Sequence, residues 1–132
     1  MKAKSYDSWR LEVPWLPVSL NVYMRQHFRV RDEQMQSAVV MLKPYLRVVL
    51  DDLGIDGPLP WKAEMTFEVY ARKQRDDDNC VVARKVLLDA MRKLNFLRND
   101  DPRCVRSIDL PCAVDRDRPR TVITIKKMEA NI

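Results

Sequence analysis

The strongest constraint on the fold is the unbroken alternation of apolar and polar side chains from Trp61 to Ala71. Apolar residues occupy the odd positions of this segment, and the even positions hold Lys62, Glu64, Thr66, Glu68 and Tyr70. Successive side chains of a strand point to opposite faces of a sheet, so the pattern predicts a long strand with one buried face. The charged segment Arg72–Asp77 follows and is expected to end the strand.

A helical period precedes this strand. Apolar residues recur over 39–50 with the spacing of one helix face, and Asp32 is suited to the N-cap position. Pro44 predicts a kink or a split near Leu42, because proline lacks a backbone donor. Gly54 is expected to end the helix, since glycine readily adopts the left-handed conformation of a C-terminal cap.

The remaining periodic segments complete an alternating order of elements. Trp9–Val13, Cys104–Pro111 and Thr121–Met128 have the pattern of strands, and Asn79–Leu94 has the pattern of a helix. The order strand, helix, strand, helix, strands predicts an α/β (α+β) fold with helices packed on a mixed sheet. We expect one domain over residues 1–132, since no boundary, repeat or low-complexity segment interrupts the chain.

Charge and glycine content narrow the classes of function. The net charge is +5 and the isoelectric point is near 9.3, which favours a polyanionic partner such as nucleic acid. The chain has two glycines, Gly54 and Gly57, too few for a glycine-rich phosphate loop or a dinucleotide fingerprint.

Cysteine usage and hydropathy argue against zinc and against a membrane. Cys80, Cys104 and Cys112 are widely spaced and the single histidine, His27, is remote from them, so a structural zinc site is not expected. Neither a signal peptide nor a run of about 18 apolar residues is found. We therefore expect a soluble cytoplasmic protein that does not contact a membrane.

The most informative chemical motif is Arg75-Asp76-Asp77-Asp78-Asn79, between the long strand and the second helix. Consecutive aspartates repel one another, and Mg²⁺ is a cation that takes carboxylate oxygens as ligands. In an extended segment Asp76 and Asp78 point to the same side and can share one ion, whereas Asp77 points away. Helix capping or plain solvation is the alternative interpretation, because one Asp or Asn at a helix start satisfies free N–H groups.

A second acidic pair, Asp100-Asp101, lies beyond the second helix. Its functional interpretation is a further metal ligand, and its alternative is a turn, for which Asn99-Asp100-Asp101-Pro102 is suitable. On the helix, Lys85 lies on the same stripe as Asp78 and Asp89. Lys85 could stabilise charge on a phosphate, or it could form an ordinary ion pair with Asp89.

The sequence resembles the RusA family of Holliday junction resolvases, which has an Asp-x-Asp-Asn motif at a helix start, a helical lysine, an Asp-Ala-Leu-like stretch and an Asp-Asp pair. The corresponding residues are Asp76-Asp77-Asp78-Asn79, Lys85, Leu88-Asp89-Ala90-Met91 and Asp100-Asp101. The family's N-terminal Pro-Trp-Pro-Pro-Ser-x-Asn motif and following aromatic residue resemble the segment from Pro14 to Tyr23. These motifs occur in the same order and cover most of the chain.

This resemblance implies a homodimeric nuclease that resolves four-way DNA junctions in recombination and repair with Mg²⁺, for which Mn²⁺ could substitute. It implies metal ligands at Asp76, Asp78 and one of Asp100 and Asp101, with Lys85 as the catalytic lysine. We expect the DNA contacts to come from Arg72, Lys73, Arg75, Arg84, Asn79, Asn21 and Arg25.

The chain departs from the family pattern at the lysine. The family lysine lies one turn after the second aspartate, where this chain has Val82, so Lys73, Arg75 or Arg84 are alternatives to Lys85. The spacing from Asp89 favours Asp100 as the further ligand, whereas the paired-acid pattern favours Asp101. A branched-DNA-binding protein without catalytic activity is the alternative function.

Overall fold

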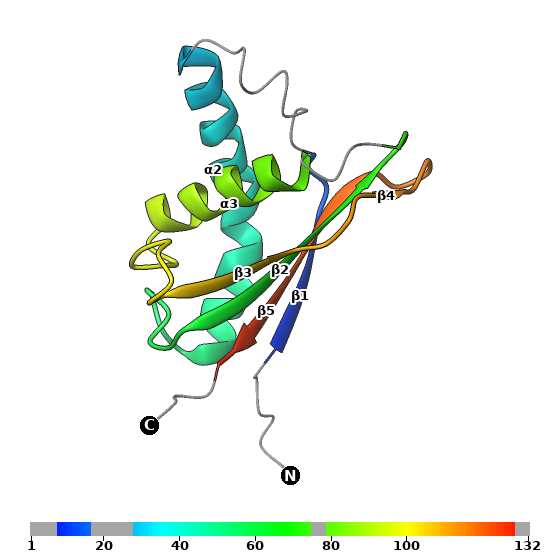
Figure 1. Ribbon diagram of the computed structural model, residues 1–132. Helices are drawn as coiled ribbons and strands as arrows, with labels where there is room; N and C mark the ends of the chain where they lie inside the picture. Colours follow the sequence, from blue (N-terminus) through cyan, green and yellow to red (C-terminus); the bar gives the residue numbers. More distant parts are fainter. Residues whose placement is uncertain (1–7, 17–27, 75–78, 129–132) are drawn as a thin grey trace.

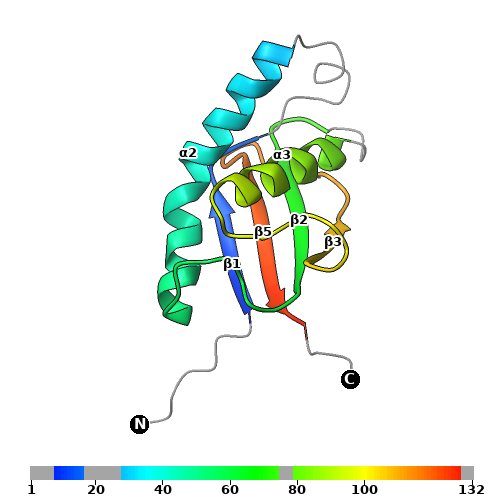
Figure 2. The ribbon, with the colours of Figure 1, turned by 90° about the vertical axis from the view of Figure 1, so that its left-hand side faces the viewer.

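A mixed sheet carries two helices on one face in the computed structural model, which describes residues 8–16, 28–74 and 79–128 (Figure 1). Of the helices, α2 runs along the sheet and α3 crosses it, as the second view shows (Figure 2). The elements are β1 (Ser8–Val13), α2 (Phe28–Leu53), β2 (Ala63–Ala71), α3 (Asn79–Lys93), β3 (Val105–Asp109), β4 (Ala113–Val114) and β5 (Arg120–Lys127). The predicted α+β architecture is confirmed.

The strand order is β1-β5-β2-β3, with the short β4 paired to β2 beyond β3. β5 is antiparallel to both β1 and β2, whereas β3 and β4 are parallel to β2. A parallel pair needs a crossover connection, and α3 supplies it between β2 and β3. The β2–α3–β3 unit therefore determines which loops meet at each end of the sheet.

The alternation predicted for the long strand is confirmed in β2. The side chains of Ala63, Met65, Phe67, Val69 and Ala71 are buried, and the residues between them are partly exposed. The strand begins two residues later than the sequence alternation does. The buried residues pack against the helices in one hydrophobic core, so the opposite face of the sheet carries polar side chains and no helix of the described segments.

Helix α2 differs from the expectation at its start and at its proline. It begins at Phe28 rather than after Asp32, because an acidic residue is tolerated inside a helix as well as at its cap and does not fix the first turn. Pro44 does not split the helix, although the helix axis changes direction along its length (Figure 2). Gly54 ends it as predicted, with φ of 69° and a hydrogen bond from Ile55 N to Leu50 O at 3.0 Å.

The later elements follow the predicted segments closely. The second predicted helix is α3, and the two late predicted strands are β3 and β5. The two-residue β4 was not predicted, since two residues are too few to show a period. No helix among the described residues is long and apolar enough to cross a membrane.

Candidate functional site

Several of the predicted site residues lie outside the described part of the chain. These are Arg75, Asp76 and Asp78 in segment 75–78, and Asn21 and Arg25 in segment 17–27. Asn79 is the first residue of α3, as the sequence predicts, and its backbone alone is described.

Two described elements flank the acidic segment in the sequence. The segment follows β2, whose carboxyl end is at Ala71, and precedes α3, which begins at Asn79. β3 is parallel to β2, so the carboxyl end of β3, at Asp109, points toward the same edge. In open sheets with helical crossovers, ligands bind at the carboxyl ends of parallel strands. We call this region the carboxyl edge.

Asp109 is a carboxylate on this side of the sheet that the sequence interpretation missed. Its Oδ2 atom lies 3.1 Å from Nε of Arg84 on α3. Burial raises the pKa of Asp109, and the Arg84 guanidinium opposes this rise. Arg84, expected to contact DNA, is thus engaged in an ion pair. The signal in the sequence was an acid at the end of a predicted strand, which becomes informative only when that strand is known to be parallel to β2.

Asp100 and Asp101 lie at the opposite end of α3. They follow the C-terminus of the helix at Lys93 and precede β3, which begins at Val105. At about 1.5 Å per residue, the 15 residues of α3 span roughly 20 Å. The described structure therefore does not bring Asp100 or Asp101 to Asn79 within one chain.

Asp101 has a local structural role. Its carboxylate accepts hydrogen bonds from Arg103 N at 3.0 Å and from the Arg103 guanidinium at 2.8 Å. The side-chain hydrogen bond from Arg103 lowers the pKa of Asp101. Its carbonyl oxygen also accepts from the N–H groups of Cys104 and Val105, so the turn interpretation of this segment holds for Asp101.

Asp100 lies close to Asp89 of α3. Burial is the main cause that raises the pKa of Asp89; Arg92 opposes the rise, and the nearby Asp100 carboxylate adds to it. Arg92 Nη2 lies 3.9 Å from Asp89 Oδ1. Among the described residues, no group of three His, Cys, Asp or Glu side chains is arranged to hold a metal ion. A metal site at the carboxyl edge would therefore need residues of the acidic segment.

Basic side chains line a shallow hollow beside the carboxyl edge. Arg72 and Lys73 are exposed immediately after β2, and Arg116 follows β4. Together with Gln74 and Val114 they form the walls of the hollow. Arg72 and Lys73 were expected to contact DNA, and Arg116 was missed. Lys85, the predicted catalytic lysine, is exposed on α3.

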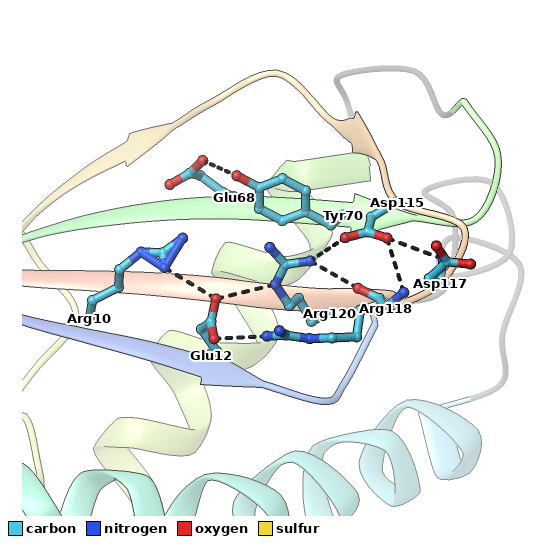
Figure 3. Close-up of polar contacts among 8 residues, drawn as sticks. All are labelled: Arg10, Glu12, Glu68, Tyr70, Asp115, Asp117, Arg118 and Arg120. Carbon is cyan, nitrogen blue, oxygen red and sulfur yellow. Dashed lines mark hydrogen bonds and ion pairs between the residues drawn. The ribbon is translucent and has the colours of Figure 1, made fainter.

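A polar network on the helix-free face fixes the loop that carries Arg116 (Figure 3). Arg120 lies 4.2 Å over the ring of Tyr70 and pairs with Asp115 at 2.8 Å and Glu12 at 3.4 Å. Glu12 also accepts a hydrogen bond from Arg118 at 2.8 Å. The Asp115 carboxylate accepts from two backbone N–H groups of the loop, and Asp115 N donates to Ala71 O.

The network also changes the titration of its members. The hydrogen bond from Arg118 lowers the pKa of Glu12, and the backbone hydrogen bond from Arg118 lowers the pKa of Asp115. The phenol of Tyr70 donates to Glu68 Oε2 at 2.8 Å, and this bond raises the pKa of Tyr70. These interactions couple β1, β2 and β5 and hold the hollow's outer wall in place.

The chain matches no protein-family model, and a search of curated proteins gave no significant match.

Proposed function

We propose that this protein is a Mg²⁺-dependent endodeoxyribonuclease that cuts branched DNA, above all four-way junctions. The observation that supports the proposal is the β2–α3–β3 unit, whose carboxyl edge brackets the Asp76–Asp78 segment. Acidic residues at that edge and basic residues beside it are the two components that metal-assisted phosphodiester hydrolysis requires. The order of motifs resembling the RusA family is an independent argument for the same function.

Asp76 and Asp78 are the metal ligands in this proposal, because their spacing allows them to share one ion. Asp109 ends β3 opposite Phe67 of β2, and its ion pair with Arg84 ties it to the first half of α3. This position favours it as the third acid of the site, in place of Asp100 or Asp101. Bound Mg²⁺ would supply an activated water and stabilise charge on the scissile phosphate. Arg84 would hold the Asp109 carboxylate in position through their ion pair.

The basic residues near the site fall into two sets with separate roles in the proposal. Arg72, Lys73 and Arg116 bind the DNA backbone, since they line the hollow beside the acidic segment. Lys85 is exposed on α3 and stabilises charge on the phosphate or the leaving oxygen. Asp100 contributes to a site only if a second chain brings it to the carboxyl edge of the first.

We also infer that the protein acts as a homodimer, because paired cuts in a four-way junction need two active sites. The outward face of α2 is the surface that we propose for this contact between the two chains. Val40 is 74% exposed and Val48 is 55% exposed, which is unusual for large apolar side chains in this structure. Glu33 and Arg47 are exposed seven residues before and after Val40. In an antiparallel α2–α2 pair centred on Val40, Glu33 of each chain would face Arg47 of its partner.

Cleavage of a labelled synthetic four-way junction tests the proposed site. We expect Asp76→Asn and Asp78→Asn to lower the Mg²⁺-dependent cleavage rate by about a hundredfold or more, because each removes a charged ligand. Asp77→Asn is the matched control, since its side chain points away from the metal in the proposed arrangement. Binding to the junction in EDTA should remain in all three variants.

Parallel variants Asp100→Asn, Asp101→Asn and Asp109→Asn identify the third acid. We expect Asp109→Asn to lower the Mg²⁺-dependent cleavage rate the most of the three. If Asp100→Asn strongly lowers the cleavage rate, and mixing this variant with Asp78→Asn restores cleavage, the third acid comes from Asp100 of the partner chain. Wild-type cleavage by Asp76→Asn and Asp78→Asn would contradict the metal site. Junction binding without any Mg²⁺-dependent cleavage would instead support the non-catalytic alternative.

A further inference from the structure

A second basic hollow lies at the end of the sheet opposite the carboxyl edge. The segment leading into β2 contributes Trp61 and Lys62, and the segment leading into β3 contributes Arg98, Arg103 and Cys104. β2 has nine residues at about 3.3 Å each, so the two ends of the sheet are roughly 30 Å apart. We call this hollow the entry pocket, because it lies where β2 and β3 begin.

The walls of the entry pocket are held together by backbone hydrogen bonds. Leu59 N donates to Phe96 O at 2.9 Å, and Ala63 N donates to Cys104 O at 3.0 Å. Trp61 stacks on Trp9 of β1 with ring centroids 6.0 Å apart and an interplanar angle of 9°. The two hydrogen bonds join the segments on either side of the hollow, and the stack anchors Trp61 to β1, so the shape of the hollow is preformed before any ligand binds.

The entry pocket concentrates positive charge. Lys62, Arg98 and Arg103 line it, and Asp101 neutralises Arg103 while holding its guanidinium through hydrogen bonds at 2.8 and 3.3 Å. Lys126 and Lys127 of β5 are exposed; Lys127 pairs in register with Ala63, immediately after Lys62, and Lys126 pairs with Glu64, which offsets one of these charges. The local excess of cations favours an anionic ligand.

The size of the entry pocket limits which class of anionic ligand can bind. Its volume is about 200 Å³, which is below the roughly 300 Å³ at which pockets for drug-sized ligands begin. A phosphate group fits such a space, and arginine and lysine are the side chains that bind phosphate most strongly. A free anion would meet the same cations, but the exposed lysines of β5 favour a ligand whose negative charge continues beyond the pocket.

We propose that the entry pocket binds a backbone phosphate of nucleic acid, as a contact separate from the carboxyl edge. This inference rests on the proposed function for the choice of DNA as the polyanion. A separation of roughly 30 Å is close to one turn of duplex DNA, about 34 Å, so one duplex arm or two arms of a junction can reach both places.

Binding of a fluorescein-labelled four-way junction in EDTA over a salt series tests the entry pocket. We expect Lys62→Ala/Arg98→Ala to weaken binding about tenfold or more and to reduce the slope of log affinity against log salt by about 1 to 2. Lys62→Arg/Arg98→Lys keeps both charges and should bind close to wild type. Lys93→Ala removes an exposed cation that does not line the pocket and is the control for a nonspecific loss of positive charge. Arg98→Ala alone, at an exposed position, replaces the double variant if that variant does not fold.

The outcomes separate this inference from the proposed function. Unchanged affinity and slope in Lys62→Ala/Arg98→Ala, or an equal loss in Lys93→Ala, would overturn the entry pocket even if the wild type cuts DNA. Loss of binding in the double variant of a protein that never cuts DNA would support the pocket and contradict the nuclease. Competition by inorganic phosphate alone at millimolar concentration, without any effect of the double variant on DNA affinity, would show a small-anion site and also overturn the proposal.

Discussion

Glu12 shows how single side chains organise the helix-free face of the sheet. It lies on β1 and receives charged hydrogen bonds from Arg10 at 3.2 Å and Arg118 at 2.8 Å, while Arg120 pairs with it at 3.4 Å (Figure 3). Arg118 and Arg120 belong to the loop and strand that follow β4. One carboxylate thus joins segments that are more than a hundred residues apart in the chain.

The lowered pKa of Glu12 predicts a specific pH dependence of stability. In the unfolded chain the Glu12 carboxyl has its ordinary pKa of 4.5, and the folded protein binds the proton less readily. The stabilisation that ionised Glu12 provides is therefore complete above about pH 5. It is lost as the pH falls through the lower pKa of the folded state. We expect Glu12→Gln to melt at a lower temperature than wild type at pH 7 and the difference to shrink toward pH 3.

Thermal unfolding followed by circular dichroism between pH 3 and pH 7 measures this effect. Asp56→Asn is the control, because the Asp56 side chain is fully exposed and should change little at either pH. A melting difference between wild type and Glu12→Gln that is equal at pH 3 and pH 7 would show that ionisation of Glu12 is not what stabilises the network.

The candidate site could be predicted from the sequence only where its residues are local. Asp76, Asp78 and Asn79 lie in one short motif, so their spacing is visible without a structure. Asp109 could not be identified in this way, because its approach to α3 depends on the parallel pairing of β2 with β3. The hydrogen bonds between Asp101 and Arg103 could not be predicted either, although the two residues are close in the chain. The reason is that the same residue types suit a turn and a metal site.

At the scale of elements, prediction succeeded where burial imposes a period. β2 could be identified because its alternate residues are buried against helices, and α3 because its apolar face covers β2 and β3. The start of α2 was missed, since helix boundaries depend on capping contacts rather than on the apolar period. The pairing of strands could not be predicted, because contacts between distant segments leave no local pattern in the sequence.

Pro44 gives a test of how α2 tolerates a helix breaker. The proline has no N–H to donate to the carbonyl of Val40, and its side chain is exposed. We expect Pro44→Ala to raise the free energy of unfolding by about 1 to 3 kcal/mol, because alanine restores the donor and has a higher helix propensity. Urea denaturation measures this change. Pro111→Ala, at an exposed position outside the helices and strands, should have a smaller effect.

A destabilised Pro44→Ala protein would show that the core requires the change of direction in α2. The bend would then be a packing requirement, and the gain from the restored hydrogen bond would be smaller than the loss of contacts with the sheet. An increase in stability would show that the sheet accepts a straighter helix. The two outcomes have opposite signs, so the measurement decides between them.

At the scale of the whole molecule, positive charge gathers at both ends of the sheet and an apolar stripe lies on the outside of α2. The hollow at the carboxyl edge and the entry pocket are both lined by lysine and arginine, and Val40 and Val48 are exposed on α2. A dimer formed through α2 would leave both basic ends of each chain accessible to DNA. The proposed dimer surface and the proposed DNA surfaces are therefore compatible.

The antiparallel arrangement of two α2 helices makes a prediction that an unspecific apolar contact does not make. Val40→Glu should raise the dissociation constant of the dimer about tenfold or more, because it places two like charges at the centre of the interface. Glu33→Arg should also weaken the dimer, since the introduced guanidinium would face Arg47 of the partner subunit. Glu33→Arg/Arg47→Glu should restore dimerisation, because the exchanged charges are again opposite. Light scattering after size-exclusion chromatography, over a range of protein concentrations, measures the molecular mass of the wild type and of each variant.

The charge exchange is informative because each single change has an alternative explanation. Arg47 already pairs with Asp51 at 2.8 Å and donates to Ile55 O, so Arg47→Glu alone also disturbs its own chain. Recovery of the dimer in the double variant cannot arise from that disturbance, whereas a monomeric double variant beside a dimeric wild type would exclude the antiparallel register. A wild type that is monomeric at all concentrations would remove the two-site mechanism and leave single nicks as the expected product.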